Sequence, residues 1–486
     1  MANKRISCLA TIAFILLTAL GIGQVAVYQN YYLVFLLVSV FLGLIVAQSD
    51  LIPIVAIVVI IPFADWAVES GLLAPQVMWA PELLSGLIFV KAVTKRVAAR
   101  KKVNLFGMRL VMVFLAVTVA SLIYNDIGVI SALLFLRLLF RYYLLFLGII
   151  NLDLSERSMR LVNSILVCVF ASQLPLSIVK LLVYGQGETP LGLSSHSAPT
   201  YIPLIAIGFL LSYYFLYRRS IVYLLASLGF VGFSIIGGKR AFVFFLSILL
   251  LWIGWFLRGR IKHFSRYAAL TALILFSSTY LAFRLIPTLN PQREVWGEFD
   301  PAHAMDYARS YTLASSPVDG RAIGRTSATI SVFEELHGRG LLSLAVGSGP
   351  GSIMKSTFRG LDHRESLETE YEVAYGWTGL NWLGIQVGYI GAAIYLLLFY
   401  LILRKALHCL GKERDPYWRS FGLGMAAFSF TILFMSIAYS RVFGHDSASA
   451  FYFCLAGFLV KRTLMYEDAP PLPVSWREYP VEYGEI

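Results

Sequence analysis

The sequence predicts an all-α integral membrane protein, a polytopic bundle of about 12–14 transmembrane helices with one large external (periplasmic) loop. The composition is 58% hydrophobic and only 14% charged, whereas soluble domains carry about 25% charged residues. The mean hydropathy is +0.72. Apolar runs of about 18 or more residues recur, the length that crosses ~30 Å of hydrocarbon, and lipid forces such runs to be helical. An outer-membrane barrel would instead alternate over segments of about 10 residues.

The apolar runs also predict the order of helices and domains. The first run reads as an uncleaved helix, because no small-residue cleavage site clearly follows it. The expected helices span residues 7–27, 31–48, 51–68, 78–94, 105–124, 128–150, 160–184, 200–217, 220–237, 240–257, 267–287, 379–403, 418–438 and 446–463. The expected domains are an N-terminal bundle (1–287), a periplasmic loop with short amphipathic helices (288–378), C-terminal membrane helices (379–464) and a cytoplasmic tail (465–486).

Basic residues set the expected orientation. The net charge of +12 comes mostly from Lys and Arg in every second connection, which is the positive-inside pattern, so both termini are expected in the cytoplasm. This distribution argues against a nucleic-acid partner. The four cysteines form no CxxC or Cys/His spacing, so no metal, cofactor or disulfide framework is expected.

The exceptions to this pattern are Lys239, Arg240 and Arg441, with Lys180 and Arg284 near external helix ends. Lys239 and Arg240 follow Gly237-Gly238 and open a predicted helix on the external face. Cations at a helix N-terminus add to the positive end of its dipole, and the glycines allow close approach of a ligand. The pair therefore predicts a phosphate or pyrophosphate site. The alternative is that both side chains snorkel to the interface, which is less expected on a side that avoids Lys and Arg.

Four further residues are candidates for a cavity. Arg137 and Arg141 share one face of the sixth predicted helix, where charge is costly and faces a cavity or a partner, unless Arg141 lies at the boundary. His196 and Arg441 lie in external loops. His196 has the titration range of a general base, although a lone loop histidine is more often inert.

The large loop holds a predicted amphipathic helix over residues 325–337. Arg321 and Arg325 stand at i, i+4 spacing at its start, and Ile330, Phe333 and Leu336 form its apolar stripe. A glycine-rich turn follows at residues 347–351. It lacks the Lys-Ser/Thr of a nucleotide-binding loop, so it is interpreted as a requirement of backbone geometry.

The order of these features resembles the O-antigen ligase and O-antigen polymerase superfamily of bacterial envelope glycosyltransferases, over about residues 137–400. The resemblance rests on Gly-Gly-Lys-Arg-Ala at a helix start, a late external loop, the run from Arg325 to Phe333 before the glycine turn, and a helix that opens Asn381-Trp-Leu-Gly-Ile-Gln-Val-Gly-Tyr-Ile-Gly391. It implies a metal-independent inverting enzyme that takes a glycan from an undecaprenyl-pyrophosphate carrier and passes it to an acceptor glycan.

The resemblance also assigns roles. Arg240 matches the family's helix-start arginine and Arg325 its loop arginine, so these two, with Lys239 and Arg321 beside them, are expected to hold pyrophosphate. Ligases of the family often carry a histidine shortly before the Asn of the post-loop helix. That histidine is missing here, which leaves Glu372 and His363 as candidates for the base and favours a polymerase.

Three functions therefore stand as expectations. The first is a polymerase of exopolysaccharide, capsule or O-antigen in the bacterial inner membrane, with other polysaccharide assembly proteins as partners. The second is a ligase that moves finished glycan to lipid A core or protein. The third is a transporter or flippase for an anionic or lipid-linked substrate.

Overall fold

The computed structural model describes residues 42–44, 46, 48–69, 71–73, 75–184, 198–258, 264–313, 324–353, 377–444 and 446–467. The helix predicted at 7–27 and most of that at 31–48 lie outside these ranges. Within them all regular structure is helical, with no strand. The all-α polytopic class is therefore confirmed for the described part of the chain.

Each helix predicted between residues 51 and 463 has a counterpart that starts close to its predicted first residue, and one predicted helix is divided into α6 and α7. In chain order the elements are α3 (Ile52–Glu69), η1 (Pro75–Met78), α4 (Trp79–Ala98), α5 (Met108–Tyr124), α6 (Val129–Phe140), α7 (Tyr143–Asn151), α8 (Glu156–Tyr184), α9 (Ala198–Leu216), α10 (Ile221–Ile236), α11 (Arg240–Leu257), α12 (Phe264–Leu285), η2 (Pro287–Leu289), α13 (Pro301–Leu313), α14 (Arg325–Gly338), α15 (Leu341–Val346), α17 (Gly379–Lys412), α18 (Pro416–Ala438), η3 (Val442–Gly444) and α19 (Asp446–Glu467).

Within the described residues, six or seven helices have the length and composition of a complete span. Six described helices are long and apolar enough to cross a membrane, namely α8, α11, α12, α17, α18 and α19. The bent pair α6–α7, with 50° between its halves, makes a seventh. Four further apolar helices have 17 or fewer residues in the ranges that count toward a span, namely Ile52–Val68 of α3, Met108–Tyr124 (α5), Thr200–Leu216 of α9 and Ile221–Ile236 (α10). The 17 residues of α5 extend only about 25 Å, so an apolar run here is not always a complete span.

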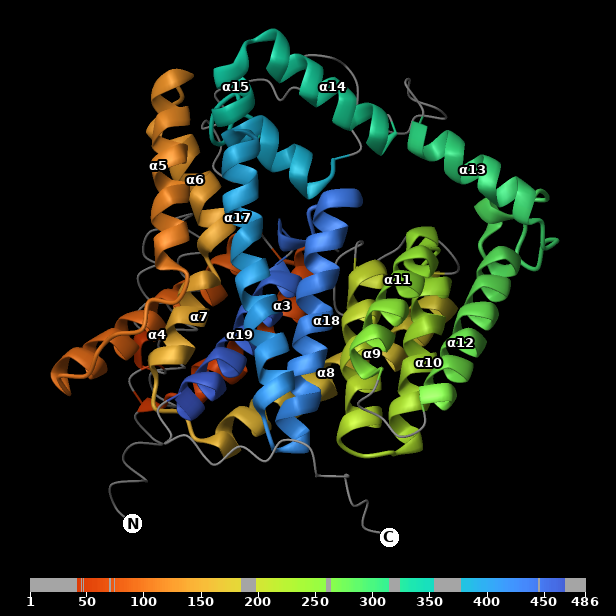
Figure 1. Cartoon of the computed structure of the whole chain (residues 1–486), viewed down its shortest axis with the longest axis horizontal. Helices are drawn as coiled ribbons and strands as arrows, with labels where there is room; N and C mark the ends of the chain where they lie inside the picture. The colour runs from red at the N-terminus through yellow and green to blue at the C-terminus, as the bar shows by residue number, and fades with distance from the viewer. Residues whose placement is uncertain are drawn as a thin grey trace.

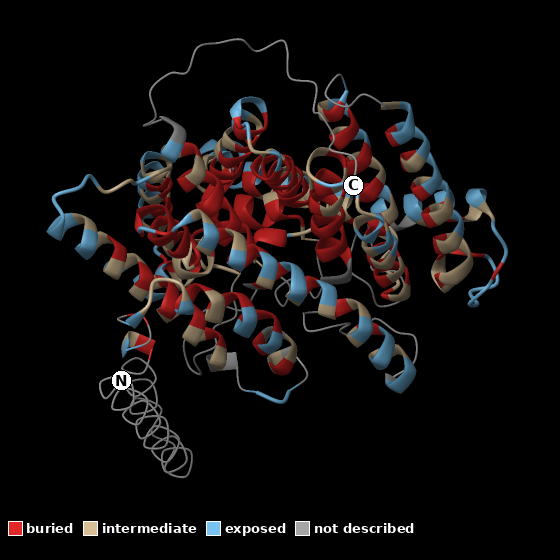
Figure 2. Ribbon diagram, turned by 90° about the horizontal axis from the view of Figure 1, so that it is seen from below, coloured by how far each residue is buried: buried red, intermediate tan, exposed pale blue. Residues whose placement is uncertain are grey.

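The helices of the described loop residues lie across one end of the bundle. Figure 1 shows α13, α14 and α15 above the ends of α11, α17 and α18. This end is called the loop end, and the opposite end, where α17 connects to α18, is called the base. The packed centre consists of α17, α18, α19 and α9, whose residues are mostly buried. Figure 2 shows the buried residues gathered in the middle of the molecule. The outer helices expose large apolar side chains such as Ile123, Leu251 and Phe276, which fits contact with lipid tails.

The helix α17 is broken near the loop end. Val387 (φ −128°) and Gly388 (φ +69°) leave the helical conformation, so residues 379–386 form a separate segment beneath α14. Only glycine fits at position 388, since a Cβ there would lie 2.0 Å from the carbonyl oxygen of Ala345. The break therefore depends on close approach of the loop backbone.

The glycine-rich turn satisfies the carbonyl groups that this break exposes. The backbone N–H groups of Ser348 and Gly349 donate to the carbonyls of Ile385 (2.6 Å) and Gln386 (3.1 Å). In an unbroken helix those carbonyls would accept from residues 389 and 390. The turn has positive φ at its three glycines, in agreement with the interpretation of residues 347–351 as backbone geometry.

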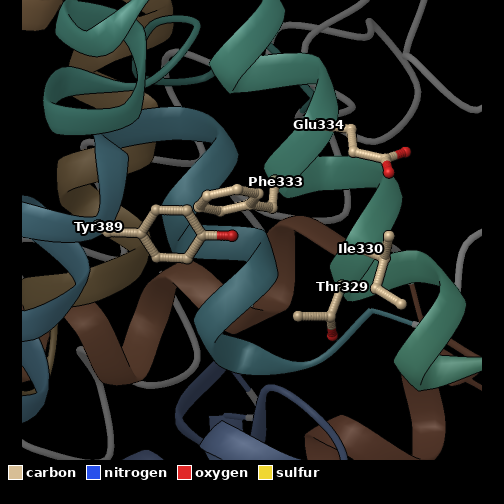
Figure 3. Close-up of a pocket in the computed structure, with 5 residues that line it drawn as sticks. All are labelled: Thr329, Ile330, Phe333, Glu334 and Tyr389. Carbon is tan, nitrogen blue, oxygen red and sulfur yellow. The ribbon is translucent and has the colours of Figure 1, made fainter.

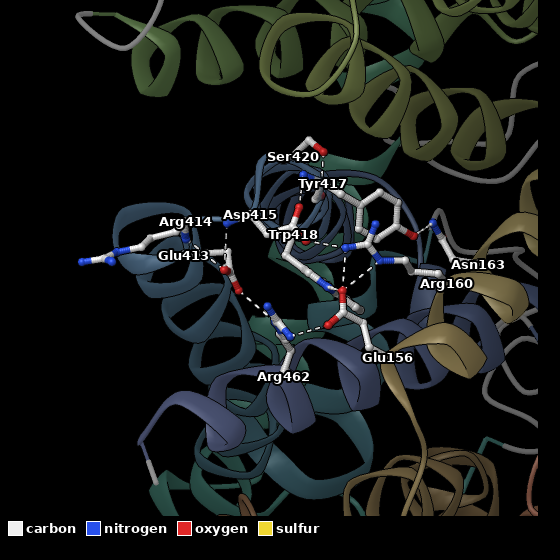
Figure 4. Close-up of polar contacts among 10 residues, drawn as sticks. All are labelled: Glu156, Arg160, Asn163, Glu413, Arg414, Asp415, Tyr417, Trp418, Ser420 and Arg462. Atoms are coloured by element: carbon white, nitrogen blue, oxygen red, sulfur yellow. Dashed lines mark hydrogen bonds and ion pairs between the residues drawn. The ribbon is translucent and has the colours of Figure 1, made fainter. Parts of the chain in front are cut away.

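The base is held by a network of ion pairs, drawn in Figure 4. Glu156 of α8 accepts hydrogen bonds from Arg160 (2.5 Å), from Arg462 of α19 (2.8 Å) and from the indole N–H of Trp418 (3.1 Å). Arg462 also pairs with Glu413, at 3.0 Å. Basic residues that the sequence marks as topological signals therefore also connect three helices.

Candidate anion-binding site

Arginines from three distant parts of the chain meet at the connection between α18 and α19, residues 439–444. The Nε of Arg325 donates to the carbonyl of Tyr439 at 2.8 Å, and its guanidinium lies 4.1 Å from the centre of the Tyr439 ring. Arg141 donates to the carbonyl of Gly444 at 3.3 Å. Arg441 belongs to the connection itself, and its guanidinium lies 5.2 Å from the Trp382 ring. Three guanidiniums therefore lie beside the connection, of which that of Arg141 is also paired with Glu82.

Arg325 is held in place by a short chain of hydrogen bonds. The amide of Asn381 donates to the hydroxyl of Thr329 at 2.8 Å, and that hydroxyl donates to the carbonyl of Arg325 at 2.8 Å. These contacts join the first segment of α17 to α14. A cation at the first residue of a helix opposes the helix dipole, so the placement of Arg325 costs stability unless an anion offsets it. This arrangement favours a binding role.

Two buried polar atoms nearby lack a hydrogen-bond partner among the described residues. They are the Oδ1 of Asn381 and the Oγ of Ser436, both in fully buried side chains. Ser436 packs against Gly379 at the start of α17. Each unsatisfied polar group costs about 1–3 kcal/mol, so such atoms call for an explanation.

The helix-start pair Lys239–Arg240 lies at the same end of the bundle. Arg240 begins α11, and its guanidinium lies 4.8 Å from the ring of Tyr307 in α13. One turn later Phe245 packs edge-on against Tyr439, at 5.3 Å between ring centres. Lys239 is the residue that precedes α11, and it is half-buried. Arg240 and Arg325 therefore both lie beside the loop helices, and α11 reaches the α18–α19 connection.

The two arginines of the sixth predicted helix have an acidic partner that sequence reasoning missed. Glu82 of α4 accepts from Arg137 at 2.6 Å and from Arg141 at 3.1 Å. Arg141 lies at the break between α6 and α7, and its side chain is only 8% exposed. The one available signal was an isolated acid within an apolar run, in the first turn of α4, where a helix favours negative charge.

The apolar face predicted for α14 is partly wrong. The buried residues are Ala328, Val332 and Leu336, whereas Ile330 and Phe333 are about half exposed. The first segment of α17 packs against residues spaced by four along α14, so the predicted stripe, spaced by three, drifts onto the neighbouring face. That neighbouring face borders an open groove, shown in Figure 3.

Four predicted site residues lie outside the described part of the chain: Glu372, His363, Arg321 and His196. In the part that is described, no group of three or more His, Cys, Asp or Glu side chains is placed to hold a metal ion. The chemistry of the described site is that of several guanidiniums with buried amide and hydroxyl groups, a set suited to a phosphorylated ligand that also carries hydroxyls.

Comparison with known proteins assigns no family. No protein-family model matches the chain, and no curated protein matches it significantly.

Proposed function

We propose that the protein is a bacterial inner-membrane glycosyltransferase that polymerises undecaprenyl-pyrophosphate-linked glycan repeats, in exopolysaccharide, capsule or O-antigen biosynthesis. The observation that carries the proposal is the meeting of Arg325, Arg441 and Arg141 at residues 439–444, at the end of the bundle that also holds Arg240. The family resemblance indicates that the substrate is a glycan. The arginines of the cationic site are suited to bind the pyrophosphate that leaves from it.

The reaction explains why fixed guanidiniums are useful. An acceptor hydroxyl attacks the anomeric carbon of the donor, the bond from that carbon to the phosphate oxygen breaks, and the pyrophosphate leaves with the electron pair. The hydroxyl proton passes to a base, for which the sequence offers Glu372 or His363. Negative charge grows on the leaving group as the bond breaks, so pre-positioned arginines stabilise the transition state more than the ground state.

Alanine substitution at Arg325, with a matched arginine as control, tests the proposal. We expect Arg325→Ala to lower polymer synthesis roughly 100-fold or more, as loss of one transition-state donor does, and Arg325→Lys to restore only part. Arg339→Ala is the control, because Arg339 caps the opposite end of the same helix, where it pairs with Glu335 at 2.8 Å and donates to the Ser348 hydroxyl at 3.3 Å. Protein levels are followed by immunoblot. Full polymer from Arg325→Ala at normal protein level would refute the proposal.

Chain length separates the polymerase from the ligase. Short chains that are still attached to their acceptor indicate loss of a polymerase, whereas long unattached chains indicate loss of a ligase. The missing histidine before Asn381 favours the polymerase.

Transport of an anionic or lipid-linked substrate is a second candidate, favoured by the interrupted spans. The helices α6 and α7 meet at an angle of 50° beside the ion pair of Glu82 and Arg141, and α17 is broken at Gly388. Discontinuous helices and buried charges are typical of substrate sites in transporters. Substrate movement by purified protein in liposomes, without formation of a glycosidic bond, would favour this function over the polymerase.

A further inference from the structure

The carboxyl-terminal end of α4 is strongly basic. Residues 91–102 hold six lysines and arginines, and no acidic residue occurs between Glu82 and Asp126. Clusters of about four to eight basic residues beside a membrane helix are typical of segments that bind anionic lipids. The structure shows which of the six basic side chains are free to do so.

The first three basic residues hold the helix in place. Lys91 and Lys95 both pair with Asp50, each at 2.8 Å. The Nε of Arg96 donates to the carbonyl of Asn151, the last residue of α7, at 2.9 Å. These contacts fix one side of α4 against its neighbours, so the charges of these three residues have partners within the protein.

The last three basic residues have no such role. Arg100, Lys101 and Lys102 are exposed, and within the described part of the chain their side chains form no hydrogen bond or ion pair. Lys101 also lies close enough to the buried Lys461 of α19 for the two charges to repel each other. Asp153 is the acid that acts on Lys461, and its single charge does not offset this group. The end of α4 therefore carries an uncompensated positive charge.

Arg100 has a backbone conformation that glycine would adopt more easily. Its φ is +53°, in the left-handed region. The N–H of Arg100 donates to the carbonyl of Val97 at 3.0 Å, and that of Lys101 donates to the carbonyl of Arg96 at 2.9 Å. This pattern is the Schellman motif, in which glycine is the usual residue at the left-handed position. A need for the charge of Arg100 accounts for a side chain at this strained position.

An exposed apolar strip leads to the three free cations. Val90 and Val97 are 56% and 62% exposed, and they lie two turns apart on the same side of α4. Figure 1 shows α4 leaning outward from the bundle. An apolar strip that ends at cations matches an acyl chain that ends at a phosphate, whereas a soluble anion would leave both valines uncovered. The surface therefore favours a phospholipid.

The end of α4 lies at the base of the bundle. The carbonyl of Leu152, beside the partner of Arg96, accepts a hydrogen bond from Lys461. The next residue, Arg462, belongs to the ion-pair network drawn in Figure 4. The base is the side that the positive-inside pattern assigns to the cytoplasm, where anionic lipids give the membrane surface a negative potential.

We propose that the end of α4 binds an anionic phospholipid, with the phosphate held by Arg100, Lys101 and Lys102 and an acyl chain along Val90 and Val97. The lipid holds the outward-leaning helix at the membrane surface. This site is independent of the proposed reaction, because it lies at the base and the arginines proposed to bind pyrophosphate lie at the loop end.

Native mass spectrometry of the purified full chain in nonionic detergent tests the site. The probes are phosphatidylglycerol and phosphatidylcholine with identical acyl chains, and the affinity of the first bound lipid is measured. We expect the wild type to prefer phosphatidylglycerol. The triple variant Arg100→Gln, Lys101→Gln, Lys102→Gln should bind phosphatidylglycerol roughly 100-fold more weakly, because each basic residue near a lipid surface contributes about a factor of five.

A second triple variant is the matched control. Arg404→Gln, Lys412→Gln and Arg414→Gln remove the same charge from exposed residues at the end of α17, also at the base. It should change the affinity by less than about threefold, because charges in water beyond a Debye length are screened. Equal binding of the two lipids by the wild type, wild-type affinity in the first triple variant, or equal losses in the two triple variants would overturn the site.

Two further measurements separate a lipid site from other roles. Arg100→Gly should raise the melting midpoint, because glycine relieves the left-handed strain, and should still weaken phosphatidylglycerol binding by roughly fivefold. A lower midpoint with unchanged lipid binding would overturn the role of Arg100. Glycerol phosphate, which has the phosphate without acyl chains, should not compete at millimolar concentration. Effective competition would overturn the lipid as the ligand in favour of a soluble anion.

Discussion

Replacing Glu82 by alanine removes the carboxylate that faces two guanidiniums, those of Arg137 at 2.6 Å and Arg141 at 3.1 Å. The Arg141 side chain is 8% exposed, so its charge remains away from water after the partner is gone. Removing one member of a buried pair costs about 3–5 kcal/mol. Arg137 is 35% exposed and adds little to this figure. Arg141 keeps its bond to the carbonyl of Gly444, so we expect the lower end, about 3 kcal/mol.

The thermal unfolding midpoint in detergent, followed by loss of the monodisperse peak in size-exclusion chromatography, measures this cost. Glu82→Ala should melt well below the wild type, and Glu82→Gln should lie between them, because the amide still accepts one hydrogen bond. The double variant Glu82→Leu with Arg141→Met removes both charges and should regain most of the stability, since apolar residues of similar volume replace a buried pair at little cost. An unchanged midpoint for Glu82→Ala, or a double variant no better than the single, would contradict the reasoning.

The double variant also separates folding from function. If Arg141 contributes to the anion site, the stable double variant still makes little polymer. If Arg141 is only a structural partner of Glu82, the double variant makes polymer at the wild-type rate.

Two further predictions concern backbone geometry and pH. Gly388→Ala should destabilise the protein by well over about 1 kcal/mol, because a Cβ there collides with the loop backbone at a positive φ, whereas Gly86→Ala, with open space around it, should leave the melting midpoint unchanged or raise it slightly. Burial opposes the ionisation of Asp50, but its ion pairs with Lys91 and Lys95, each at 2.8 Å, outweigh burial and hold its pKa below the ordinary value. The stabilisation that the ionised Asp50 contributes is therefore present above about pH 4 and is lost as pH falls through its lowered pKa. The difference in melting midpoint between the wild type and Asp50→Asn should be constant from pH 8 to about pH 5 and should disappear below about pH 4. A gap that persists at pH 3 would contradict the ion-pair explanation.

The apolar runs were sufficient to predict the class and the order of helices, because hydrocarbon permits no other structure for such segments. They did not reveal the break in α17, since Val387 and Gly388 look like any other residues of an apolar run. The break is created by the loop backbone that packs at Gly388 from far along the chain. Apolar runs also did not predict helix length, because those of α5 and α10 form helices of only 17 and 16 residues.

The departures from the positive-inside pattern pointed to Arg240 and Arg441, and the family resemblance pointed to Arg325. The structure places all three at the loop end. Their relation to residues 439–444 was not predictable, because it depends on contacts between helices distant in sequence. Glu82 was missed since a single acid carries no spacing signal. Phe333 was assigned to the wrong face because a stripe of three residues fits more than one side of a helix.

A structure of the protein bound to an undecaprenyl-pyrophosphate-linked repeat tests the central claim most directly. The account predicts the diphosphate within hydrogen-bond distance of the guanidiniums of Arg325 and Arg441, at the α18–α19 connection. A diphosphate bound at the base, or one beside Glu82 and the α6–α7 break without contact to Arg325, would contradict it.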